Sequence, residues 1–140
     1  MKHSPGFEKL CETARKNVRE VSLADVNARL DRNEAFTLID VREDNEFAVD
    51  HLPKALHFGR GVLERDIEAT FPDPNTDIVL YCGGGYRSAL AAESLQRMGY
   101  TNVASMAGGV RGWREAGLVM VPGASVPSVD TAGQSGKPRA

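Results

Sequence analysis

Cys82 and the loop that follows it are the residues with the clearest potential for chemistry. The apolar run at residues 78–81 predicts a buried strand before the cysteine, and residues 88–98 have helical spacing. The glycines between them allow a tight backbone curl, and the N–H groups gathered at a helix N-terminus favour an anion. Arg87 adds a full positive charge at the same rim. Each of these features stabilises a thiolate, so the sequence predicts that Cys82 is nucleophilic.

The same residues also have a structural interpretation. A free cysteine is often a small core hydrophobe, and a Gly-rich turn often only connects a strand with a helix. Three consecutive glycines, however, lose much backbone entropy on folding, and a plain connection does not require them. A cradle of converging amides does require them, and we therefore prefer the reactive interpretation of Cys82.

The elements around the loop predict an α/β domain with a mainly parallel central sheet flanked by helices on both faces. Short apolar runs predict strands at residues 20–21, 37–41, 55–58, 78–82 and 103–106. Helical patterns follow Ser22, which we expect to be an N-cap, and also cover residues 44–50, 62–71, 88–98 and 110–116. We further expect Asp44 to cap its helix, Gly99 to be a C-cap and Gly117 to close the last helix. Parallel sheets carry their chemistry at the carboxyl ends of strands, where Cys82 falls.

Composition and charge exclude several classes of protein. The chain has 140 residues, which suits one domain, and its 17 basic and 19 acidic residues give a net charge of −2. No basic stripe indicates a nucleic-acid partner, and no apolar run is long enough to span a bilayer. The first twenty residues lack the apolar core of a signal peptide, and two cysteines cannot form a disulfide framework, so we expect a cytoplasmic protein. His3, His51 and His57 show no metal-ligand spacing, and no metal or resident cofactor is expected.

The chain divides into three segments. Residues 1–17 are expected to form an amphipathic helix that precedes the domain, with Phe7, Leu10, Cys11, Ala14 and Val18 on one face. Residues 18–121 contain the domain, and residues 122–140 form a Pro/Gly/Ser-rich tail with too few apolar residues to order itself. Cys11 is expected to be a packing residue, although a role as a resolving partner for Cys82 stays open.

Separated sequence motifs, in order, resemble those of the single-domain rhodaneses, a family of sulfurtransferases. The resemblance covers residues 18–118 and is carried by the segments 38–42, 46–47, 51–56, 82–88 and 108–113. It implies that Cys82 attacks a sulfane-sulfur donor such as thiosulfate and carries the sulfur as a transient persulfide. A nucleophilic acceptor, cyanide or a thiol, then removes it. Lys54 departs from the pattern, which usually has glycine there, and the loop lacks the basic residues beside the cysteine that many thiosulfate-using members carry.

The resemblance also divides the motif residues by role. The amides of residues 83–88 are expected to converge on the persulfide, and Arg87 to hold an anionic donor. The persulfide-binding residues would be Gly83, Gly84, Gly85, Tyr86, Arg87 and Ser88. The structural residues would be Asp40, Arg42, Glu46, His51, Gly108, Gly109 and Trp113. Three of these residues have alternatives: Tyr86 as a surface aromatic, Asp40 in an active role, and His51 as a proton carrier.

Two other functions compete with sulfur transfer to small molecules. Related folds use a cysteine loop closed by arginine in phosphatases and arsenate reductases, but such loops resemble a longer version with five intervening residues. Only four residues separate Cys82 from Arg87, which shrinks the ring of amides around an anion and disfavours phosphorus chemistry. The second alternative is a sulfur carrier or a regulatory module that acts with a protein partner.

Overall fold

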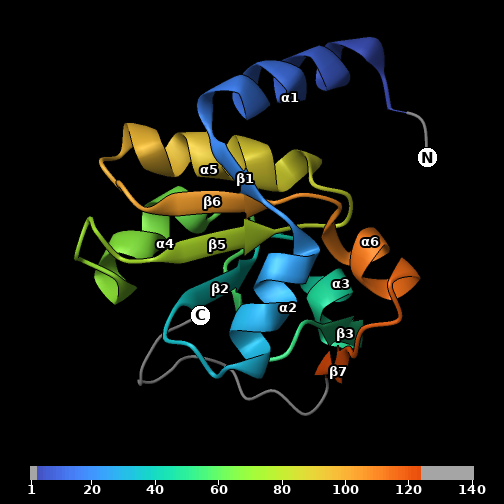
Figure 1. The fold of residues 1–140 in the computed structure, drawn as a ribbon. Helices are drawn as coiled ribbons and strands as arrows, with labels where there is room; N and C mark the ends of the chain where they lie inside the picture. Colours follow the sequence, from blue (N-terminus) through green and yellow to red (C-terminus); the bar gives the residue numbers. More distant parts are fainter. Residues whose placement is uncertain (1–2, 124–140) are drawn as a thin grey trace.

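A five-stranded sheet forms the centre of the molecule, and all of its strand pairs are parallel (Figure 1). The structure is a computed structural model and describes residues 3–123. In spatial order, the strands are β1 (Arg19–Val21), β6 (Val103–Met106), β5 (Ile78–Tyr81), β2 (Thr37–Asp40) and β4 (Leu56–His57). All four residues of the central strand β5 are buried, as expected where both faces of a parallel sheet are covered. The predicted α/β class is therefore confirmed.

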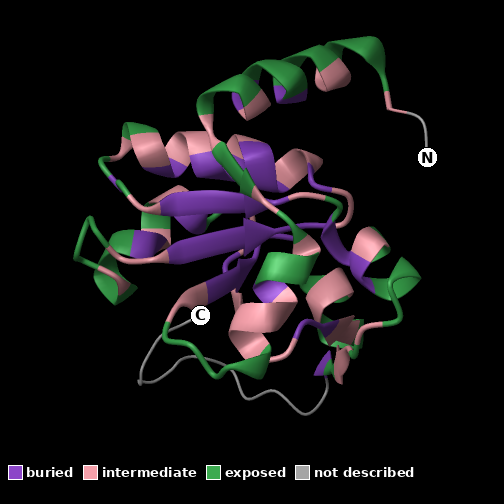
Figure 2. Cartoon of the chain, viewed as in Figure 1, coloured by how far each residue is buried: buried purple, intermediate pink, exposed green. Residues whose placement is uncertain are grey.

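Helices cover both faces of this sheet, and the core is divided into two parts by it. Ile78 and Leu80 of β5 pack with α4 (Leu63–Thr70) and α5 (Tyr86–Arg97), whereas Val79 and Tyr81 pack with α2 (Leu23–Asp31) and α6 (Gly109–Glu115). The alternation follows from the two-residue period of a strand. Figure 2 shows the buried residues concentrated in the sheet and on the inner sides of these helices. Cys82 belongs to the α4–α5 side of the core.

Helix ends differ from the sequence predictions at Asp44, Gly85 and Gly99. Ser22 does cap α2, because its Oγ accepts from the Asp25 N–H at 3.0 Å. The prediction for Asp44 was wrong: Glu43 is the N-cap of α3 (Asp44–Val49), and the Asp44 side chain is 98% exposed. α5 begins two residues earlier than expected because Gly85 takes a left-handed φ of 93° and becomes its N-cap. Gly99, at φ 109°, follows the C-cap rather than forming it.

A second, two-stranded sheet joins distant parts of the chain. β3 (Asp50–His51) pairs antiparallel with β7 (Val121–Pro122), so that Pro122 faces Asp50. Two-residue strands leave no periodic pattern, and the sequence therefore gave no signal for this pairing. The predicted tail begins at residue 122, and residues 124–140 of that tail lie outside the described residues.

The N-terminal extension forms a helix, α1 (Pro5–Asn17), that packs on α5 as an outer layer (Figure 1). Cys11 and Ala14 are fully buried, and these two residues of the predicted apolar face lie in the contact. Leu10 is 56% exposed, so its assignment to the buried face was wrong. The apolar row on α1 is wider than the surface that contacts α5, so Leu10, at the edge of the row, stays in solvent. Within residues 3–123, no helix has the length and apolar character needed to cross a bilayer.

Candidate active site

The Cys82 sulfur lies directly after β5 and is held by backbone amides of the following turn. Its Sγ accepts from the N–H of Gly85 at 3.1 Å and from the N–H of Ser88 at 3.3 Å. The side chain is fully buried. The first N–H comes from the N-cap of α5 and the second from its first turn, where amides have no partner within the helix. This arrangement brings peptide dipoles onto one sulfur atom and stabilises negative charge there.

Two buried serine hydroxyls extend the hydrogen bonding away from the sulfur. Ser88 Oγ lies 3.5 Å from Cys82 Sγ and 2.8 Å from Ser105 Oγ. Ser88 and Ser105 are both fully buried. Ser105 is not among the site residues predicted from sequence, although a hydroxyl within the apolar strand β6 was an available signal. Since β6 pairs with β5, residues at the carboxyl ends of both strands meet at this point.

The first turn of α6 closes the loop from the other side. The Val110 N–H donates to Cys82 O and the Arg111 N–H to Gly83 O, both at 2.9 Å. Gly109 takes a φ of 57°, and a Cβ on it would lie 2.5 Å from Cys82 O. Because such an approach is sterically impossible without backbone movement, only glycine allows α6 to lie this close to the cysteine. Gly108, at φ 85°, is also in the left-handed region, as the turn required.

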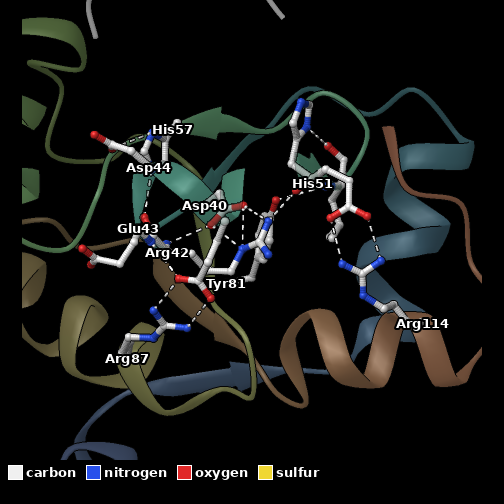
Figure 3. A network of polar contacts seen from close by, with 12 residues as sticks. Asp40, Arg42, Glu43, Asp44, His51, His57, Tyr81, Arg87 and Arg114 are labelled. Carbon is white, nitrogen blue, oxygen red and sulfur yellow. Dashed lines mark hydrogen bonds and ion pairs between the residues drawn. The ribbon is translucent and has the colours of Figure 1, made fainter. Parts of the chain in front are cut away.

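Arg87 lies at the rim of the loop and forms an ion pair with Glu46 of α3. Its Nη1 donates to Glu46 Oε1 at 2.9 Å and its Nη2 to Oε2 at 3.4 Å (Figure 3). A Cβ at Gly83 would lie 3.1 Å from Arg87 Nη2, so glycine there leaves room for the guanidinium. The pair raises the pKa of Arg87 and lowers the pKa of Glu46 from their ordinary values, in each case chiefly through this hydrogen bonding. The positive charge of Arg87, which was predicted to hold an anionic donor, is thus paired with the Glu46 carboxylate.

A buried ion pair supports the neighbouring strand. Arg42 binds Asp40 through Nε and Nη2, with Nη2–Oδ2 at 2.9 Å, and its Nη2 also donates to Asp50 O at 2.7 Å (Figure 3). The Tyr81 hydroxyl accepts from Leu52 N–H at 3.0 Å, and burial is the main reason that the pKa of Tyr81 is raised. These contacts join the ends of β2 and β5 to the 50–52 segment.

The remaining motif residues also make structural contacts. His51 Nδ1 lies 2.9 Å from Leu52 O, and its ring stacks on Phe47 with ring centroids 4.2 Å apart. Trp113 is 1% exposed and donates from Nε1 to Val119 O at 3.0 Å. Neither His51 nor Trp113 lines the pocket at the cysteine loop. His51 thus contacts the backbone beside it and Trp113 lies in the core, and their assignment as structural residues stays a prediction.

An open pocket of about 410 Å³ lies in front of the loop. The loop contributes Gly83, Gly84, Tyr86 and Arg87, and α6 together with its N-cap contributes Gly108, Arg111, Gly112 and Glu115. His3, just before α1, completes the lining. His3 and Arg111 are candidate site residues that the sequence analysis missed. His3 lies 80 residues from the loop in sequence (83 − 3), and no motif connects the two segments.

The aromatic ring of Tyr86 is enclosed by residues of the N-terminal extension. Its centroid lies 4.4 Å from that of His3 and 5.9 Å from that of Phe7, and the Arg15 guanidinium carbon lies 4.5 Å from it. Such an arginine–aromatic contact is favourable. Tyr86 therefore lines the pocket mouth as a packed residue and is not an isolated surface aromatic. Beneath these contacts, burial raises the pKa of Cys11, as is typical of a packing cysteine.

Comparison with known proteins identifies the fold and the family. The family model described as "Rhodanese-like domain" matches residues 22–116, which include the loop, α6 and the Asp40–Arg42 segment. The chain belongs to the rhodanese-like domain family. The matched range begins after α1, so the helix that encloses Tyr86 lies outside the part of this rhodanese-like protein that the model matches.

Individual relatives agree with this assignment. The rhodanese-like chain is 31% identical over 104 residues to a sulfurtransferase of Allochromatium vinosum, covering 74% of this chain and 95% of that protein. It is also 31% identical over 108 residues to YrkF of Bacillus subtilis, provisionally named a sulfur carrier. That alignment covers 77% of this chain but 57% of YrkF. Among solved structures, RPA3614 of Rhodopseudomonas palustris, a protein of unknown function suggested to be a tyrosine phosphatase, has a TM-score of 0.76 and 29% identity, covering 86% and 97% of the two chains. Sulfur transfer, in general terms, is therefore supported by family and relatives.

Proposed function

We propose that this protein is a sulfurtransferase that moves a sulfane sulfur from an anionic donor such as thiosulfate to a thiol or to cyanide. The observation that carries the proposal is the buried Cys82 sulfur, which accepts from two backbone amides of a loop whose residues Gly83, Gly84, Tyr86 and Arg87 line an open pocket. Amides fixed in this way stabilise an anionic sulfur without any reorganisation during the reaction. Both cysteines are free, which suits a reducing compartment, and we propose the cytoplasm.

In the first half-reaction, the Cys82 thiolate attacks the outer sulfur of thiosulfate. A bond forms between Sγ and that sulfur, and the bond to the central sulfur breaks, so that sulfite leaves with the electron pair. Charge is conserved, since the thiolate becomes a persulfide anion. The rate of such an exchange depends on the thiolate fraction and on access to the sulfur. The amides of residues 83–88 would bind the outer sulfur of the persulfide, and no resident cofactor is needed.

In the second half-reaction, an acceptor removes the outer sulfur. A thiolate or cyanide attacks that sulfur, the S–S bond to Cys82 breaks, and the cysteine leaves as a thiolate with the electron pair. Gly85 and Ser88 contact the same atom at the start and at the end of the cycle. Their amides would therefore stabilise the leaving thiolate as well as the attacking one.

Mass spectrometry of the intact protein after exposure to thiosulfate tests this proposal directly. We expect the mass to increase by one sulfur atom, with the addition mapped to the Cys82 peptide and removed again by cyanide. Cys82→Ser should show no addition, and Cys11→Ser should still show it, because Cys11 is a packing residue of α1, whereas the amides of Gly85 and Ser88 bind the Cys82 sulfur. Absence of an adduct with every sulfane donor tried would falsify the catalytic role of Cys82.

A sulfur carrier that delivers the persulfide to a protein acceptor is the second candidate. The relationship to YrkF supports it, and the same loop chemistry would serve both functions. Acceptors separate the two candidates, because a carrier would discharge slowly to small thiols and quickly to its protein partner. Phosphoryl transfer is less well supported, since four residues separate Cys82 from Arg87; Cys82-dependent turnover of a phosphate ester would contradict this view.

A further inference from the structure

Two arginines line the pocket in front of Cys82, and they differ in what they contact. The guanidinium of Arg87 is bound by both oxygens of Glu46, at 2.9 and 3.4 Å. This carboxylate neutralises much of the charge that Arg87 could offer to an anion. The contact also fixes Arg87 at the edge of the loop, with Nη2 against Gly83. Arg87 therefore joins the loop to α3, and its attraction for an anionic donor is reduced by the Glu46 carboxylate.

Arg111 is the second arginine, and its position is set by the loop itself. Its backbone N–H donates to Gly83 O at 2.9 Å, which fixes the start of its side chain beside the pocket. The side chain is exposed and lines the pocket. Among residues 3–123, no carboxylate lies within ion-pair distance of its guanidinium. An arginine that is anchored by its backbone but carries an uncompensated guanidinium is well suited to bind an anion.

The other walls of the pocket contribute shape and one opposing charge. His3 and Tyr86 form an edge-to-face pair with ring centroids 4.4 Å apart. Glu115, on the same helix as Arg111, is the acidic residue of the lining. Arg15, behind Tyr86, lies 3.5 Å from Glu20 and does not line the pocket. Arg111 is therefore the lining residue whose charge is available to a ligand.

We propose that Arg111 determines the preference of this site for anionic donors, by binding the charged group that leaves with the electron pair. Arg87, in contrast, positions the loop through Glu46. The inference rests on the proposed function only for the identity of the donor, because attraction of anions toward Cys82 is a property of the pocket. It differs from the sequence-based prediction, in which Arg87 helps to hold an anionic donor.

Alkylation of Cys82 by iodoacetate and by iodoacetamide tests the inference without any sulfur transfer. The two reagents are similar in size and share a leaving group, but only iodoacetate is an anion. The ratio of their rates therefore reports the attraction of anions to the pocket and cancels changes in access. Peptide mapping assigns the modification to Cys82 and excludes Cys11.

For Arg111→Gln, we expect the iodoacetate-to-iodoacetamide ratio to fall about threefold to fivefold, the range of an exposed charge interaction. Arg111→Lys should restore most of the ratio, and Glu115→Gln should raise it. Arg97→Gln is the matched control, because it removes one positive charge at the far end of α5 and should leave the ratio unchanged. In steady-state assays with thiosulfate, Arg111→Gln should raise KM with little change in kcat.

An unchanged ratio in Arg111→Gln would overturn the inference, as would an equal fall in Arg97→Gln. The outcome is separable from that of the proposed function. If the protein formed no persulfide but the ratio still fell, sulfur transfer would be rejected and the anion-binding role of Arg111 would stand. If persulfide formed and the ratio did not change, sulfur transfer would stand and the anion-binding role of Arg111 would be rejected.

Discussion

Three hydrogen-bonding groups surround the Cys82 sulfur, and only one of them is a side chain. The amides of Gly85 and Ser88 cannot turn away, whereas the Ser88 hydroxyl can rotate. Ser105 Oγ, at 2.8 Å, restricts that rotation. If Ser105 donates to Ser88, the proton of Ser88 is directed at the sulfur, where it would stabilise a thiolate and later a persulfide. Ser105 would then act as a positioning residue, because its Oγ contacts Ser88.

We expect Ser88→Ala to slow alkylation of Cys82 by iodoacetamide about fivefold, since a hydrogen bond is worth about 1 kcal/mol. Ser105→Ala should slow it by a smaller factor, about twofold to threefold, because the Ser88 hydroxyl remains but is no longer oriented. The rate profile against pH should move toward higher pH in both variants. Ser94→Ala, also on α5, is the control; a Ser105→Ala profile identical to that of the unaltered protein would remove Ser105 from the site.

At the scale of elements, α3 and α5 are joined across the carboxyl edge of the sheet by Glu46 and Arg87 (Figure 3). Both side chains are about one-third exposed, at 34% and 32%, so solvent screens the pair. The pKa of Glu46 is lowered in the folded state. Its contribution to stability is therefore fully present above the ordinary value of 4.5 and is lost as pH falls through the lowered value.

Urea unfolding between pH 7 and pH 3 should reveal this linkage. At neutral pH, we expect Glu46→Gln to reduce the free energy of unfolding by about 0.5–1 kcal/mol. The difference from the unaltered protein should shrink as pH falls below 4.5, because the unfolded chain then binds the proton more readily than the folded one, and it should vanish below the lowered folded-state pKa, where the carboxylate is protonated in both states. Glu12→Gln, on the exposed side of α1, should show no such convergence. A difference that stayed constant down to pH 3 would mean that Glu46 acts through packing.

The elements themselves were largely predictable, since strands and helices follow from periodicity and from glycine and proline positions. The β6 range was predicted as 103–106 and observed as Val103–Met106. The N-cap of α3 was not predicted correctly. Glu43 and Asp44 are adjacent acidic residues, and the choice between them depends on which backbone N–H donates to Glu46. The early start of α5 depends on the left-handed φ of Gly85, which three consecutive glycines leave undetermined by sequence.

At the scale of the whole molecule, the site combines segments that are far apart in the chain. Cys82 and its loop were found from local sequence, because strand, glycines and helix are contiguous. Arg111 and His3 were not found, since their approach to the loop depends on how α6 and α1 pack. The Glu46–Arg87 pair spans 41 residues and is set by the parallel order of β2 and β5. Tertiary contacts of this kind carry no local pattern.

The β3–β7 pair joins the segment after α6 to the segment after α3. Val121 and Pro122 pair with the 50–51 strand, and Gly123 lies so close to α3 that a Cβ would be 2.2 Å from Ala48 O. A chain ending at Gly123 should keep its urea midpoint and its sulfur-transfer rate. A chain ending at Met120 should lose about 1–2 kcal/mol of stability with the backbone hydrogen bonds of β7. Loss of activity in the chain ending at Gly123 would show that residues 124–140 are required.

The position of His3 at the pocket has a practical consequence for protein preparation. Because His3 lines the pocket, a fusion made close to this residue would add atoms beside the pocket lining. A polyhistidine tag would also bring extra cationic imidazoles and bound nickel toward a nucleophilic thiol. Measurements of donor preference are therefore best made on protein from which such a fusion has been cleaved without a residual scar.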